Sequence, residues 1–157
     1  MTVAIGQRIP DFIAPATAGK DIDSARLRGW NVVIYFYPKD DTPGCTLEGQ
    51  DFRDSYDAFK AARTLVLGVS RDSLKSHEKF QCKYSLPFPL IADEDERLCR
   101  LFDVIRMKNM YGKQVQGVER STFLIDRDGV LRREWRAVKV DGHVAEVLSA
   151  AQAITNR

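Results

Sequence analysis

Apolar runs of strand length alternate along the chain with segments of helical periodicity. The continuous β-branched and aromatic run 31–37 predicts a central strand buried on both faces, and 64–70 predicts a second. A helix is predicted between them, from Pro43 onward. The apolar face of this helix repeats at i, i+4 and i+7, through Phe52, Tyr56 and Phe59.

The later part of the chain continues the alternation, whereas prolines and a glycine break residues 1–30 into a small hairpin and loop. The remaining predicted elements are a helix over 72–85 capped by Asp72 or Ser73, a strand over 88–92, a helix from Asp93, a polar loop over 106–117, strands over 119–125 and 130–138 joined by a turn at 126–129, and a helix over about 141–153. This order predicts an α/β fold with helices on both faces of a mixed sheet.

Composition agrees with one globular domain over residues 1–157. Hydrophobic residues make up 44% and charged residues 29%, and the net charge of +2 argues against nucleic acid as a partner. Neither a signal peptide nor an apolar stretch of membrane-spanning length is recognised, so we expect no membrane association and a cytoplasmic location.

Three cysteines occur, Cys45, Cys82 and Cys99, which are too few for a secreted disulfide scaffold. This usage fits a reducing compartment, where cysteines are reactive, metal-binding or part of the core. The histidines, His77 and His143, form no ligand pairs with metal-like spacing, so no metal site is expected.

Cys45 stands out by its position. It follows Pro43 and Gly44 at the predicted start of a helix, where free N–H groups and the helix dipole favour the thiolate. Thr42 is placed to hydrogen-bond the sulfur or an oxygen substrate near it, and Pro38 to shield the sulfur from water. From residue chemistry alone, an inert buried cysteine at a helix start remains an alternative.

The string Pro38-Lys-Asp-Asp-Thr-Pro-Gly-Cys-Thr46 resembles the signature of the peroxiredoxins, in particular the peroxiredoxin Q or bacterioferritin comigratory protein group. The segments Asn109–Lys113 and Val118–Ile125 are similar to the same group, and the resemblance covers nearly the whole chain. It implies a thioredoxin-like fold and a cofactor-free thiol peroxidase that reduces hydrogen peroxide and organic hydroperoxides.

The same resemblance implies roles for individual residues. Cys45 would be the peroxidatic nucleophile, with Pro38, Thr42 and Arg120 completing its pocket and Thr42 acting as a hydrogen-bond donor to the developing charge. A guanidinium stabilises a thiolate and can hold peroxide oxygens. The alternative for Arg120 is a surface or structural ion pair with Glu119 or another nearby carboxylate, and Glu48 is a candidate to orient it.

The resolving cysteine is also inferred from the resemblance. Many members of the group carry it five residues after the first, but that position here is Gln50. Another branch uses a cysteine in the next major helix, which implies an intramolecular Cys45–Cys82 disulfide reduced by thioredoxin or glutaredoxin, with local unwinding around both cysteines. The alternative is that Cys82 is a core thiol and resolution is intermolecular. Cys99 is expected to be a small buried hydrophobe.

Two other functions compete with the peroxidase. The first is a cysteine hydrolase with Cys45 as nucleophile and His77 or His143 as base, but the sequence shows no oxyanion motif and no Asn or Asp to orient the base. A peroxide-responsive redox sensor or binding module with little turnover remains the alternative. Because the implied resolving thiol lies in the same chain, we expect a monomer.

Overall fold

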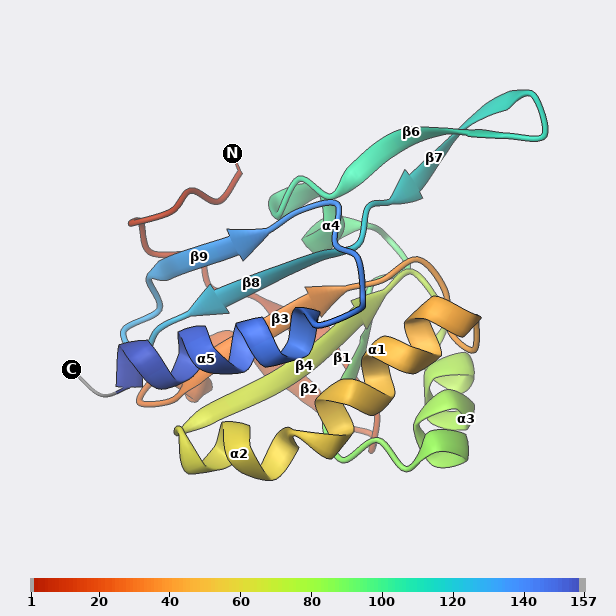
Figure 1. The fold of residues 1–157 in the computed structure, drawn as a ribbon. Coiled ribbons are helices and arrows are strands. Elements are labelled where there is room, and N and C mark those ends of the chain that lie inside the picture. Colours follow the sequence, from red (N-terminus) through yellow and green to blue (C-terminus); the bar gives the residue numbers. More distant parts are fainter. Residues whose placement is uncertain (1, 156–157) are drawn as a thin grey trace.

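A five-stranded mixed sheet forms the centre of the protein (Figure 1). The structure is a computed structural model and describes residues 2–155. The strand order is β5-β4-β3-β8-β9, and β3 pairs in parallel with β4 and antiparallel with β8. These strands are β3 (Asn31–Phe36), β4 (Thr64–Ser70), β5 (Leu90–Ala92), β8 (Ser121–Ile125) and β9 (Leu131–Trp135). The predicted α/β class and mixed sheet are confirmed.

Alternation along β3 divides the core between the two faces of the sheet. Val32 and Ile34 face one cluster of buried apolar residues, while Val33 and Tyr35 face the other. The N-terminal segment and α4 cover the first face, and the other helices cover the second (Figure 1). The helices are α1 (Pro43–Asp54), α2 (Tyr56–Ala61), α3 (Leu74–Tyr84), α4 (Arg97–Leu101) and α5 (His143–Thr155).

The predicted N-terminal hairpin is present as β1 (Ile13–Pro15) and β2 (Asp21–Asp23), followed by a short 3-10 helix (Ser24–Leu27). The helix predicted from Pro43 is divided at Ser55, where the backbone leaves the helical region with φ −101° and ψ 2°. Within residues 2–155, no helix combines the length and the apolar character needed to cross a membrane.

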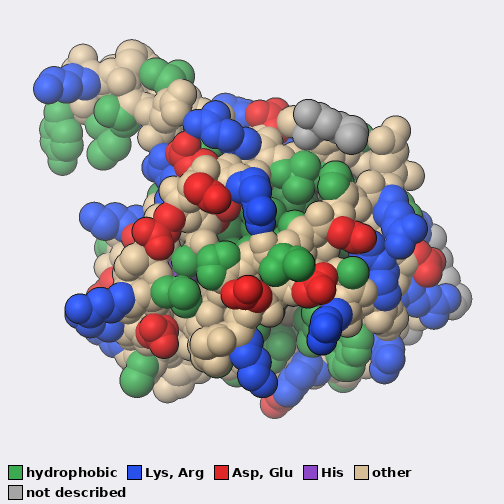
Figure 2. Space-filling model, turned by 180° about the vertical axis from the view of Figure 1, so that it is seen from behind, with side chains coloured by type: hydrophobic (Ala, Val, Ile, Leu, Met, Phe, Trp, Pro, Cys, Tyr) green, Lys and Arg blue, Asp and Glu red, His purple; other side chains and the backbone are tan. Residues whose placement is uncertain are grey.

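Residues 106–117, predicted as a polar loop, instead form most of a β-hairpin. Its strands are β6 (Ile105–Met110) and β7 (Lys113–Val118), and the hairpin projects from the body of the molecule (Figures 1 and 2). Tyr111 and Gly112 both have positive φ, 54° and 78°, as a two-residue hairpin turn requires. The prediction was wrong because most of this hairpin is exposed and its strands lack the apolar face by which strands are recognised.

Strand pairing brings distant segments to one edge of the sheet. Phe36, the last residue of β3, is opposite Ser121, the first residue of β8. Arg120 therefore lies beside the loop that leaves β3 and leads to Cys45. The predicted strand over 119–125 placed Arg120 inside a strand, but Arg120 immediately precedes β8.

Candidate active site

Cys45 lies in the first turn of α1, immediately after the loop that leaves the central strand. It is 2% exposed. Pro43 opens the helix, and Thr42, the N-cap residue, makes no side-chain capping hydrogen bond. The N–H groups of the first helical turn have no acceptor inside the helix. They therefore present positive dipole ends beside the sulfur.

Arg120 approaches Cys45 from the start of β8. Its Nη2 donates to Cys45 Sγ at 3.4 Å, and its Nη1 donates to Glu48 Oε1 at 2.7 Å. Gly44 makes room for this approach, because a Cβ at that position would lie 3.1 Å from Arg120 Nη2. The two ends of one guanidinium thus join the thiol and a carboxylate.

Glu48 is fully buried beneath this contact. Burial raises the pKa of Glu48 to about 7, although the Arg120 charge and hydrogen bond oppose the rise. Burial also raises the pKa of Tyr35 well above its usual range, and the charges of Glu48 and Cys45 add to the effect. Glu48 Oε2 and Tyr35 Oη are both buried without a hydrogen-bond partner within residues 2–155. The expectation that Glu48 orients Arg120 agrees with the 2.7 Å contact.

Thr42 and Pro38 flank the nucleophile in sequence, but the hydroxyl of Thr42 differs from expectation. Its Oγ1 donates to the carbonyl of Lys39 at 2.8 Å rather than to the sulfur. Because its only proton is used there, the hydroxyl offers lone pairs, not a donor, to any neighbouring group. Pro38 is half-buried just beyond the end of β3.

The comparisons with known proteins agree with one another. The AhpC/TSA family model matches residues 5–134. The peroxiredoxin Bcp of Bacillus subtilis is 45% identical over 157 residues, the whole of both chains. That of Xanthomonas campestris is 58% identical over 122 residues, 78% of this chain and 76% of the relative. The chain belongs to the AhpC/TSA family, as a peroxiredoxin of the Bcp/PrxQ group. The resemblance and the peroxidase class are confirmed, in place of a hydrolase.

Solved structures of peroxiredoxins support the same fold. A cysteine-to-serine mutant of Xylella fastidiosa PrxQ gives a TM-score of 0.92 at 40% identity, with 98% of both chains covered. A trapped intermediate/ligand complex of Xanthomonas campestris bacterioferritin comigratory protein, which concerns alkyl peroxide reduction by that protein, gives 0.88 at 50% identity over 92% of both chains. The thioredoxin-like fold expected from the resemblance is confirmed.

The other two cysteines of this peroxiredoxin differ sharply in environment. Cys82 is exposed in the last turn of α3, so the alternative of a core thiol is wrong. Cys99 is completely buried, as expected, and burial followed by the charge of Asp93 raises the pKa of its thiol. All three cysteines are free, so the structure is that of the reduced chain.

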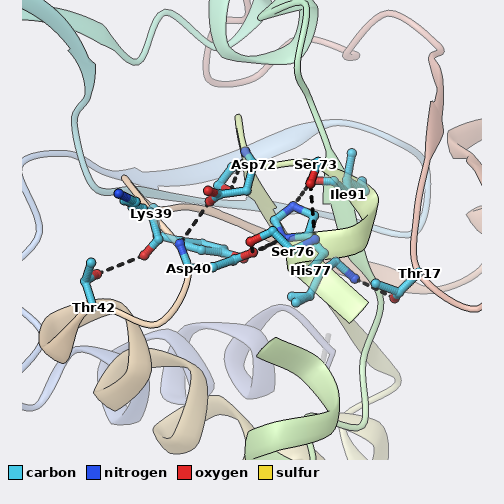
Figure 3. A network of polar contacts seen from close by, with 12 residues as sticks. Thr17, Lys39, Asp40, Thr42, Asp72, Ser73, Ser76, His77 and Ile91 are labelled. Carbon is cyan, nitrogen blue, oxygen red and sulfur yellow. Dashed lines mark hydrogen bonds and ion pairs between the residues drawn. The ribbon is translucent and has the colours of Figure 1, made fainter. Parts of the chain in front are cut away.

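Sequence reasoning missed a buried polar network beside the active-site loop (Figure 3). Asp40, Asp72 and His77 place potential metal-ligating atoms within 4.8 Å of one another. However, His77 Nδ1 lies 2.8 Å from an Asp40 oxygen and Nε2 lies 2.8 Å from the carbonyl of Ile91, while Tyr37 donates to the other Asp40 oxygen at 2.6 Å. Asp72 Oδ2 accepts the backbone N–H of Asp40 at 2.9 Å. All three groups are therefore hydrogen-bonded within the protein, and the network is structural.

Proposed function

We propose that this peroxiredoxin reduces hydrogen peroxide and alkyl hydroperoxides by an atypical two-cysteine mechanism, with Cys45 as the nucleophile. The observation that carries the proposal is the contact of Arg120 with Cys45 at a helix start. The guanidinium and the helix dipole both stabilise the thiolate, which is the reactive form of a cysteine. The alkyl peroxide reduction described for the Xanthomonas campestris relative supports the substrate class.

In the first step, the Cys45 thiolate attacks the nearer oxygen of the peroxide. The S–O bond forms as the O–O bond breaks, giving a Cys45 sulfenic acid and an alkoxide or hydroxide that takes up a proton. Nη2 of Arg120 stabilises the charge that develops on the leaving oxygen. The Thr42 hydroxyl accepts a hydrogen bond from the peroxide O–H, since its own proton is donated to the backbone carbonyl of Lys39. Pro38 limits access of water to the sulfur.

In the second step, the thiol of Cys82 attacks the Cys45 sulfenic sulfur, releasing water and forming an intramolecular disulfide. The exposure of Cys82 in the last turn of α3 supports this assignment. A dithiol protein such as thioredoxin or glutaredoxin then reduces the disulfide, in the reducing cytoplasm. The monomer is sufficient for this cycle. The alternative is a sensor that oxidises rapidly but turns over little.

Single-turnover and steady-state measurements of Cys82→Ser test the proposal, with Cys99→Ser as the matched control. We expect Cys82→Ser to consume one equivalent of peroxide at the unmodified rate and then stop with thioredoxin as reductant. Cys99→Ser should continue to turn over. Sustained thioredoxin-driven turnover by Cys82→Ser would exclude Cys82 as the resolving residue. Rapid oxidation without turnover in the unmodified chain would favour the sensor.

A further inference from the structure

Two neighbouring carboxylates in the loop before Cys45 bind opposite ends of α3, the helix that carries Cys82. Asp40 contacts the first turns, where Ser76 Oγ donates to its Oδ2 at 2.8 Å beside His77 (Figure 3). Asp41 contacts the last turn, where it accepts hydrogen bonds from Lys83 Nζ at 2.8 Å and Tyr84 Oη at 2.7 Å. The two ends of α3 are therefore held by contacts of different kinds.

The contact of Asp40 with His77 is a buried anchor. His77 is completely buried and Asp40 is 7% exposed. Since the Ile91 carbonyl only accepts, His77 Nε2 donates to it at 2.8 Å, while Nδ1 faces the Asp40 carboxylate at 2.8 Å. Breaking these contacts would leave unpaired polar groups in the core. Such groups are costly, so the first turns of α3 resist release.

The contacts of Asp41 are exposed. The side chains of Asp41 and Lys83 are 45% and 58% exposed, so water can replace either partner at small cost. Lys83 and Tyr84 directly follow Cys82, and Tyr84 also accepts a hydrogen bond through its carbonyl from Arg53 of α1. Asp41 thus holds the single turn of α3 that contains Cys82 against the loop that leads to Cys45.

We propose that Asp41 is a positioning residue for the resolving step: a releasable clamp that keeps the Cys82 turn folded, while Asp40 and His77 anchor the start of α3. This inference rests on the proposed Cys45–Cys82 disulfide. Forming that bond requires the two Cα atoms to come within about 7 Å. Opening the Asp41 contacts frees the last turn of α3 to move, and the anchored first turns confine the unwinding to the end that carries Cys82.

Asp41→Asn is a clean test because asparagine also tolerates the left-handed backbone at this position, φ 58°. The variant removes the charge that holds Lys83. Asp103→Asn is the matched control, since Asp103 is also exposed, ion-paired to an arginine and left-handed, with φ 55°. Tyr84→Phe removes the second contact of the clamp, and the double variant removes both.

Rapid mixing with one equivalent of peroxide, followed by acid quench and mass spectrometry, separates formation of the sulfenic acid from formation of the disulfide. We expect Asp41→Asn to form the Cys45–Cys82 disulfide faster, on the order of two- to fivefold, with sulfenic acid formation within about twofold of the unmodified rate. Tyr84→Phe should act in the same direction. Added salt should accelerate the unmodified chain and the control but not Asp41→Asn, because salt screens the exposed ion pair.

Unchanged or slower disulfide formation in both Asp41→Asn and the double variant would overturn the clamp. If the unmodified chain forms no Cys45–Cys82 disulfide, the proposed resolving step itself fails. If the disulfide forms at the same rate in the unmodified chain and in Asp41→Asn, only the clamp fails. The two failures are therefore distinguishable.

Discussion

Replacing Glu48 by glutamine tests the electrostatics beneath the nucleophile. Burial raises the pKa of this carboxyl from 4.5 to about 7, against the opposing effect of Arg120, and its Oε2 has no partner within the described residues. Glutamine keeps the shape of the side chain and an acceptor for Arg120 Nη1, but it does not titrate. The substitution therefore removes one ionisation and little packing.

The expected effect follows from linkage between protonation and folding. A carboxyl whose pKa is higher in the folded chain binds its proton more tightly there, so it favours folding below pH 4.5 and loses that contribution as pH rises through about 7. The interval from 4.5 to about 7, at roughly 1.4 kcal/mol per pKa unit, corresponds to about 3.5 kcal/mol well below pH 4.5, of which about 3 kcal/mol remains at pH 4.5, where half of the unfolded carboxyl is already ionised. As the pH rises from 4.5 to 8, the free energy of unfolding of Glu48→Gln should therefore increase by about 3 kcal/mol relative to that of the unmodified chain.

Urea unfolding of the reduced proteins at about pH 4.5, 6, 7 and 8 measures this difference directly. Glu78→Gln, at an exposed position of α3, is the control and should give a curve parallel to that of the unmodified chain. If Glu48→Gln also runs parallel, the carboxyl does not change its proton affinity on folding. The attribution of its raised pKa to burial would then be refuted.

Two further predictions concern Arg120 and the thiol of Cys99. Arg120→Lys keeps the charge but loses the forked guanidinium that contacts both Glu48 and Cys45, so sulfenic acid formation should slow on the order of a hundredfold. A stopped-flow rate within about threefold of the unmodified rate would contradict the role of the guanidinium in the first step. Cys99 is completely buried with a raised thiol pKa, so iodoacetamide should label Cys82 in the native reduced chain and leave Cys99 unlabelled, whereas prompt labelling of Cys99 would contradict its burial.

The sequence predicted the parts of the fold that depend on a buried apolar pattern. The run 31–37 lies in the core on both faces of the sheet, and its composition allows few other structures. The hairpin formed by β6 and β7 was not predicted, because its exposed strands carry no such pattern. The one local signal for the hairpin was Gly112, because glycine favours the positive φ that Tyr111 and Gly112 adopt in the turn.

The active-site residues also differ in how far the sequence predicts them. Cys45 could be predicted from its local sequence, because a helix start is signalled by consecutive residues. Arg120 needed the resemblance, because its contact with the sulfur depends on the pairing of β3 with β8. Asp40 and Asp41 are identical neighbours in sequence, and no local pattern separates them. Their difference comes from partners 36 to 43 residues later in α3, which bury one carboxylate and leave the other exposed. A division between a fixed anchor and a releasable clamp can therefore be argued only once the position of α3 is known.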